Sequence, residues 1–229
     1  GDAEDCMAID YVLELRCPVK EAVPTARLAE LVRAQRLGET PADWAQLEPL
    51  APHCAACRAN VLQQPFGCYG TIEYPIRLAV EQWLMSRLPE TLGSTAGHFL
   101  VAAIRDFQYN GEPVARLRGN RDFFESRKPA RRQWGPWLNK RTITSDQILQ
   151  MMFGLGNLGP SHCVTLALFL GILPHDFDPY RSDTTERNRQ LAAAQIAPPR
   201  SDPPHMEMAA FLRTVAMSPV LDVPVLVDA

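Results

Sequence analysis

The chain lacks an apolar run long enough to cross a bilayer. Its longest such run, from Val164 to Leu173, is about half of the roughly 20 residues that a membrane-spanning helix needs. The N-terminus reads Gly-Asp-Ala-Glu-Asp, which is acidic where a secretory signal is basic. We therefore expect a cytoplasmic protein of bacterial type with no membrane segment.

Cysteine is scarce and clustered. Six cysteines in 229 residues are too few for a disulfide scaffold, and three of them fall in the pattern C-x2-C-x10-C at Cys54, Cys57 and Cys68. In a reducing compartment a C-x2-C pair is more often a metal or redox site, so we expect no disulfides.

A glycine-rich phosphate loop is also missing. Residues 154–159 spell G-x-G-x-x-G, but they lie between two expected helices with no strand before them, which is the wrong context for a nucleotide site. His175, Asp176 and Asp178 fit no metal motif, and we interpret them as a turn.

What the chain does have is helical periodicity. Apolar content of 46% and charged content of 21% are typical of a globular protein with a core. We predict a helix-rich α+β single domain with a few short strands and a Cys-rich metal-binding loop. Its parts are an N-terminal strand with the metal loop (7–76), a helical core (77–217) and a C-terminal strand or tail (218–229). We expect helices near 24–38, 76–89, 94–107, 144–154, 161–170, 183–196 and 208–215, with caps at Ser94, Ser161 and Asp183 and a capping box that begins at Thr144. We expect strands near 7–15, 71–76 and 114–118, and an edge strand near 220–227 because it carries Pro224. Pro129, Gly135 and Pro136 predict mainly loop in the basic stretch after residue 118.

The cysteine loop predicts a metal site. A structural zinc site needs four ligands, and the loop supplies three. Cys17, at the end of the first strand, is the best fourth ligand, ahead of His53, His98 and Cys6. Four thiolates equally suit a [4Fe-4S] cluster, which would make this an iron–sulfur redox protein. The alternative is that the thiols are reduced and packed as small hydrophobes. Thioredoxin-like exchange needs a strand before Cys54, and none is expected.

The same stretch resembles an uncharacterised bacterial protein family. The resemblance covers roughly the first ninety residues and rests on Cys-x2-Cys-x-Ala-Asn followed by Pro-Phe-Gly-Cys-x-Gly-x-Ile-x-Tyr-Pro-Ile at 65–76. It supports grouping Cys17 with the three clustered cysteines and implies no activity. Ala56 departs from the family pattern, in which proline is expected.

Positive charge is concentrated in one segment. The segment from Arg116 to Arg141 contains nine basic residues and two acidic ones, Asp122 and Glu125. It therefore carries a net charge of +7, and the rest of the chain carries −10. Arginines neutralise phosphates and aromatic rings stack on bases, so this composition favours nucleic acid or another anionic partner. The alternative is a solvated loop that pairs with acidic surface elsewhere. The candidate binding residues are Arg116, Arg118, Arg121, Arg127, Lys128, Arg131, Arg132, Trp134 and Trp137.

Cys163 is the one candidate nucleophile. It lies near a helix start, where backbone amides lower a thiol pKa, but neither His175 nor His205 is placed as a catalytic histidine. The simpler interpretation is a buried cysteine. We assign no catalytic residue, and we predict a metal-stapled protein with a non-catalytic binding or regulatory role.

Overall fold

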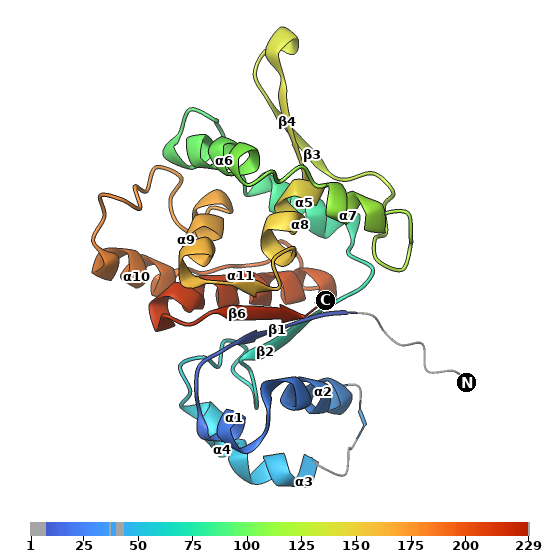
Figure 1. The fold of residues 1–229 in the computed structure, drawn as a ribbon, viewed down its shortest axis with the longest axis vertical. Coiled ribbons are helices and arrows are strands. Elements are labelled where there is room, and N and C mark those ends of the chain that lie inside the picture. The colour runs from blue at the N-terminus through green and yellow to red at the C-terminus, as the bar shows by residue number, and fades with distance from the viewer. Residues whose placement is uncertain (1–7, 37, 40–43, 229) are drawn as a thin grey trace.

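The computed structural model describes residues 8–36, 38–39 and 44–228. Its centre is an antiparallel sheet in the order β2-β1-β6-β5, with helices on both faces (Figure 1). The α+β class is therefore confirmed. The strands are β1 (Ala8–Leu13), β2 (Tyr69–Glu73), β5 (Asn157–Leu158) and β6 (Val225–Asp228).

Alternation along β1 divides the interior into two cores. Successive side chains of a strand point to opposite faces. Ile9, Tyr11 and Leu13 accordingly join the larger core, whereas Val12 joins a smaller one. The sheet is thus the middle layer of three.

The smaller core lies between the sheet and the N-terminal helices. Val19, Leu28 and Phe66 are buried in it, together with Cys54. Figure 1 shows these helices as a separate layer below the sheet. They are α1 (Pro18–Ala22), α2 (Thr25–Arg36), α3 (Trp44–Leu47), the 3-10 turn η1 (Glu48–Leu50) and α4 (Pro52–Ala55).

The larger core lies on the opposite face. There α11 (Pro203–Leu221) rests on β1 and β2, and α9 (Pro160–Phe169) packs against α11. The expected helix starts are confirmed at Ser94, at Asp183 and at the Thr144 capping box, whereas Gly159 and not Ser161 precedes α9. The remaining helices of this layer are α5 (Leu78–Ser86), α6 (Thr95–Asp106), α7 (Glu112–Leu117), α8 (Ser145–Phe153) and α10 (Thr184–Ala193).

A two-stranded hairpin projects from this layer. It pairs β3 (Arg131–Trp134) with β4 (Arg141–Thr144) around the 3-10 turn η2 (Trp137–Asn139), and it rises away from the body in Figure 1. The sequence predicted mainly loop here because of its glycine and prolines. Gly135 instead forms the turn, at φ +91°, a left-handed conformation that glycine adopts easily.

Two further expectations are corrected by the fold. Residues 114–118, predicted as a strand, belong to the helix α7 and its end. The C-terminal strand was expected at a sheet edge because it carries Pro224. β6 instead lies between β1 and β5, and Pro224 precedes it, so the missing N–H of proline falls outside the ladder.

Within the described ranges, no helix is both long and apolar enough to cross a membrane.

Candidate functional site

The four cysteines predicted as ligands come from three separate elements. Cys17 directly precedes α1, Cys54 lies in α4 with Cys57 just after it, and Cys68 directly precedes β2. The amide of Cys57 donates to the carbonyl of Cys54 at 3.2 Å, which closes the tight turn expected for a C-x2-C pair. All five cysteines in the described part of the chain are free thiols.

These four cysteines line one small cavity. Its volume is about 20 Å³, which leaves room for a single water-sized object. Its walls also include the apolar side chains of Val19, Leu28 and Phe66, and Lys20 and His53 complete the lining. The fold therefore brings Cys17 to the clustered cysteines across a separation of about 40 residues.

The electrostatics of the cavity show that the thiols act on one another. Burial raises the pKa of the Cys68 thiol to about 12, the charge of Lys20 opposes this, and the three other thiols raise it further. Burial likewise raises the pKa of Cys54. Burial therefore favours the protonated form of Cys54 and Cys68. A divalent cation would reverse that preference.

The thiols do not form a closed coordination shell. Among the described residues, no three His, Cys, Asp or Glu side chains are arranged as a metal-binding group. What fits a metal is the donor set, four thiols around a cavity with room for one ion. His53 lines the same cavity, His98 lies on α6 outside its lining, and Cys6 is outside the described residues.

Asn60 holds the cysteine loop in shape. Its amide nitrogen donates to the carbonyl of Cys54 at 2.8 Å, and its Oδ1 accepts from the amide of Gln64 at 3.2 Å. A Cβ on Gly67 would lie 1.9 Å from that oxygen, so only glycine fits beside Asn60. The Cys-x-Ala-Asn and Phe-Gly-Cys elements of the sequence pattern are therefore parts of one loop.

Arg118, predicted to bind an anionic partner, lies in the interior instead. It is 4% exposed. Its guanidinium donates to Glu81 and to Ser145 Oγ at 3.1 Å and also pairs with Asp146. The Phe124 ring centroid lies 4.2 Å from it. Both carboxylates are buried, so the guanidinium is held by the protein and cannot reach a partner.

Arg132 and Trp134 also serve the fold. Arg132 donates to the carbonyls of Met85, Ser86 and Leu88, which end α5. The indole N–H of Trp134 donates to the carbonyl of Pro89 at 3.0 Å. These two side chains fasten the base of the hairpin to α5.

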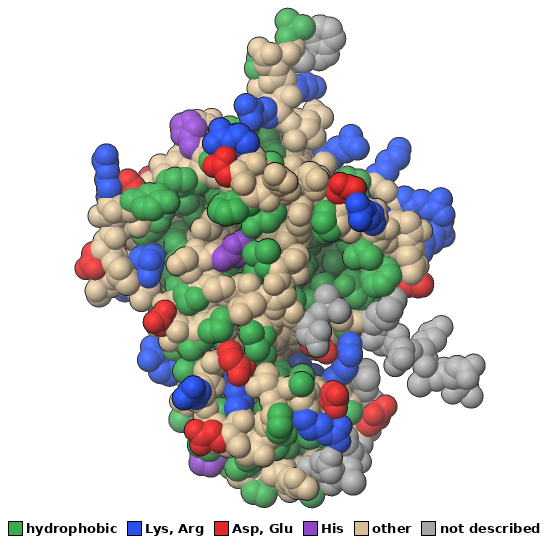
Figure 2. All heavy atoms as spheres, viewed as in Figure 1, with side chains coloured by type: hydrophobic (Ala, Val, Ile, Leu, Met, Phe, Trp, Pro, Cys, Tyr) green, Lys and Arg blue, Asp and Glu red, His purple; other side chains and the backbone are tan. Residues whose placement is uncertain are grey.

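The other basic residues of the segment face solvent. Arg121, Arg127, Lys128 and Arg131 are exposed, as are Lys140 and Arg141, which sequence analysis did not include among the candidates. Arg116 is exposed but pairs with Glu112 at 2.6 Å. The side chain of Trp137 lies outside the described part, while its neighbour Leu138 is 82% exposed at the hairpin tip. Figure 2 shows Lys and Arg side chains gathered at the right-hand edge, where α7 and the loop after it lie.

Cys163 is a buried cysteine, as the simpler interpretation held. It is fully buried, its Sγ lies 3.8 Å from the carbonyl of Leu158, and burial raises the pKa of its thiol to about 11. His162 beside it is engaged with the carbonyl of Met151 at 2.8 Å. A protonated, enclosed thiol is not a nucleophile.

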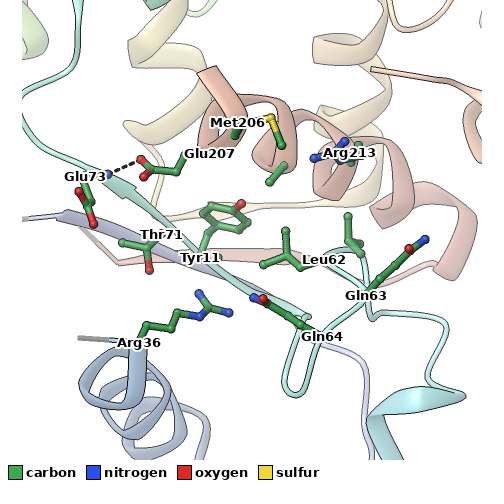
Figure 3. A pocket seen from close by; sticks show the side chains of 13 residues that line it. Tyr11, Arg36, Leu62, Gln63, Gln64, Thr71, Glu73, Met206, Glu207 and Arg213 are labelled. Carbon is green, nitrogen blue, oxygen red and sulfur yellow. Dashed lines mark hydrogen bonds between the residues drawn. The ribbon is translucent and has the colours of Figure 1, made fainter. Parts of the chain in front are cut away.

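A polar pocket at the outer edge of β2 was not predicted from the sequence. It is lined by Tyr11, Arg36, Glu207 and Arg213 among others (Figure 3). These side chains are far apart in sequence and match no motif. Gly70 is the one feature of the local sequence that relates to the pocket. Its position opposite Tyr11 follows only from the register of β1 and β2.

Comparison with known proteins gives no further identification. No family model, no curated protein and no solved structure matches the chain.

Proposed function

We propose that this protein is a zinc-stapled binding protein whose four-cysteine site is structural. The observation that carries the proposal is the single ion-sized cavity that Cys17, Cys54, Cys57 and Cys68 share. Structural zinc sites use four protein ligands, commonly four thiolates, and keep no position for substrate.

The staple would tie the end of β1 to the loop before β2. A four-thiolate zinc site carries two net negative charges, and Lys20 at the cavity wall offsets one of them. Val19, Leu28 and Phe66 keep the site dry, which strengthens the metal–thiolate attraction. This role needs no catalytic residue.

The cavity favours zinc over an iron–sulfur cluster. A volume of about 20 Å³ suits one ion, whereas a [4Fe-4S] cluster would need the four cysteine-bearing segments to move apart. The redox alternative therefore requires a rearrangement that the zinc site does not.

Metal analysis of freshly purified protein tests the staple. We expect a colourless protein with one equivalent of zinc per chain, and loss of that zinc in Cys17→Ser and Cys68→Ser. Cys163→Ala is the matched control and should keep its zinc. A brown protein that absorbs near 400 nm and bleaches on reduction would establish the iron–sulfur alternative, and absence of both metals would refute the staple.

We further propose that the protein binds a polyanion, with single-stranded nucleic acid as the favoured class. The surface involved, here called the basic edge, consists of Arg121, Arg127, Lys128, Arg131, Lys140 and Arg141. What supports it is the exposure of all six residues along one segment and its hairpin. The acidic Glu125 is engaged elsewhere, since it accepts from the amide of Leu78 at 2.8 Å and pairs with Arg77.

Salt titration of binding to a single-stranded oligonucleotide tests the basic edge. Counterion release predicts an affinity that falls steeply with salt, with a slope that decreases by about 0.7 for each phosphate contact removed. Arg127→Ala with Arg131→Ala should weaken binding and flatten the slope. Arg181→Ala with Arg200→Ala removes two exposed arginines elsewhere and should change neither. Affinity that is flat between low and high salt would refute the proposal.

The cysteine-enzyme alternative has a separate test. A buried thiol with a raised pKa should resist iodoacetamide at neutral pH as long as the protein is folded. Rapid selective alkylation of Cys163, read by mass spectrometry, would revive that alternative.

A further inference from the structure

The pocket at the outer edge of β2 is a polar concavity that no role proposed so far uses. It has a volume of about 530 Å³ and receives side chains from β1, β2, α2, α11 and the loop after Cys57. Figure 3 shows Arg36 entering from α2, Arg213 from α11 on the other side, and the Tyr11 ring between them.

Gly70 is what lets Tyr11 reach this pocket. Tyr11 and Gly70 are paired across β1 and β2, and β2 is the edge strand. A Cβ on Gly70 would lie 2.1 Å from Tyr11 Cζ, so the ring lies over the glycine. Its hydroxyl is thereby carried across the edge strand to the pocket. Any other residue at position 70 would block that path.

The pocket contains polar atoms without protein partners. Tyr11 is 3% exposed, and its buried hydroxyl makes no hydrogen bond in the described structure. The hydroxyl of Thr214 is close enough to lower the Tyr11 pKa as a hydrogen-bonding neighbour, but the two hydroxyls do not meet the geometry of a hydrogen bond, and Thr214 donates to the carbonyl of Ala210 at 3.0 Å. The buried Nε of Arg213 also lacks a hydrogen-bond partner. Buried polar groups are normally satisfied, so these two atoms have hydrogen-bonding capacity that the protein does not use.

Two arginines and the carboxylate of Glu207 act on the Tyr11 hydroxyl. Arg36 and Arg213 both act on it electrostatically, each opposing the rise in the Tyr11 pKa that burial causes. Arg36 is positioned by a hydrogen bond of 2.9 Å from its Nη2 to the carbonyl of Tyr69. The pocket thus offers two guanidinium groups, a hydroxyl donor and the amides of Gln63 and Gln64.

We propose that this pocket binds a small molecule through a carboxylate or phosphoryl group held between Arg36 and Arg213, with the Tyr11 hydroxyl as a further donor. Guanidinium groups match the oxygen pairs of both anions, and a concave site encloses part of the ligand. The observations that carry this are the two unpartnered polar atoms and the two arginines that line the pocket from α2 and α11.

The side of the pocket away from Arg213, where Glu207 and Glu73 lie, limits what the ligand can be. Glu207 accepts from the amide of Glu73 at 2.9 Å, so two carboxyl groups lie there together (Figure 3). A second anionic group on the ligand would be repelled at that end, whereas an amine or hydroxyl would find acceptors. The ligand class is therefore a small molecule with one anionic group and a hydrogen-bond donor at its other end.

Calorimetric titration with three probes tests the site. Inorganic phosphate, phosphoethanolamine and 4-aminobutyrate distinguish phosphoryl from carboxylate recognition, because each carries a single anionic group, and chloride at matched ionic strength is the reference anion. We expect at least one probe to bind ten times more tightly than chloride. Arg36→Gln and Arg213→Gln should each weaken that binding at least tenfold. Arg127→Ala with Arg131→Ala should leave it unchanged, which separates this pocket from the basic edge.

Tyr11→Phe keeps the test meaningful if an arginine variant does not fold. Removing an unpartnered buried hydroxyl should leave the melting temperature of the free protein equal or higher, yet weaken probe binding at least threefold. No probe binding above chloride would overturn the proposal. So would probe binding that Arg36→Gln, Arg213→Gln and Tyr11→Phe all leave intact.

Discussion

Asn60 shows how one side chain can set the shape of a loop that carries the chemistry. It joins the carbonyl of Cys54 to the amide of Gln64, and so links the cysteine side of the loop to its return. The spacing of the cysteines was visible in the sequence. The reason for an asparagine and a glycine between them was not, because it is a contact across seven residues.

Gly67→Ala should destabilise the protein. The added Cβ would lie 1.9 Å from Asn60 Oδ1 and 2.9 Å from the carbonyl of Gln64, so the loop must open. We expect a loss of about 1–3 kcal/mol in the free energy of unfolding, the usual cost of overpacking, measured by urea denaturation. Gly119→Ala is the control, since its Cβ would meet only the carbonyl of Arg116 at 3.7 Å. Equal stability of the two variants would contradict the account of the loop.

Glu207 should make stability depend on pH. Burial raises its pKa from 4.5 to about 7, the amide of Glu73 opposes this, and the Glu73 charge adds to the rise. The folded state therefore keeps a proton that the unfolded chain has released, and stability falls as pH rises from about 5 through 7.

Glu207→Gln removes this titration. Relative to the variant, the wild type should lose on the order of 1–2 kcal/mol of unfolding free energy between pH 5 and pH 8, a figure reduced for the partial exposure of the group. Chemical denaturation at both pH values measures it. Parallel stability profiles of the two proteins would refute the assignment.

Individual elements were predictable where local chemistry decides them. The caps at Ser94, Thr144 and Asp183 act within three residues, so their helices could be located from the sequence. The strand expected at 114–118 is a helix because Pro113 lies in its first turn, Glu112 pairs with Arg116, and α7 packs on α8. The hairpin and the central place of β6 depend on distant partners, which local pattern does not show.

Arg118 anchors the start of the segment that follows α7. Because Arg118 is turned inward to Glu81 and Asp146, it joins α5, α7 and α8 at one buried point. Composition alone counted it with the surface arginines, since a buried ion cluster and a solvated basic loop have the same residue content.

Arg118→Ala should be strongly destabilising. It leaves two carboxylates in the interior without their cation, for which we expect a loss of about 3–5 kcal/mol of unfolding free energy in urea. Arg121→Ala, at an exposed position three residues on, should cost less than about 0.5 kcal/mol. Similar losses in the two variants would show that Arg118 is not held as described.

The whole molecule is two cores that share one sheet. The proposed staple belongs to the smaller core, where Val12, Cys54 and Tyr69 are buried, and not to the larger one. The four cysteines could be predicted because three are close in sequence. The anion pocket could not, because Tyr11, Arg36 and Arg213 converge only after β1, α2 and α11 have packed.

Chelation of the proposed zinc should therefore destabilise the layer of the smaller core before the layer of the larger core. We expect amide hydrogen exchange in α1–α4 and residues 56–68 to accelerate at least tenfold in EDTA, while α9 and α11 keep their protection. Mass spectrometry of peptic fragments measures both. Uniform acceleration across the chain, or none, would contradict a staple confined to the smaller core.

The central place of β6 has a consequence for synthesis of the chain. Among the described elements β1 is synthesised first, whereas the strand that pairs with its inner edge, Val225–Asp228, is synthesised last. Until then β1 has an unpaired edge, whose free N–H and C=O groups can pair with a strand of another chain. We expect a nascent or prematurely terminated chain that stops short of residue 225 to aggregate. A holding chaperone would bind such a chain at the unpaired edge of β1.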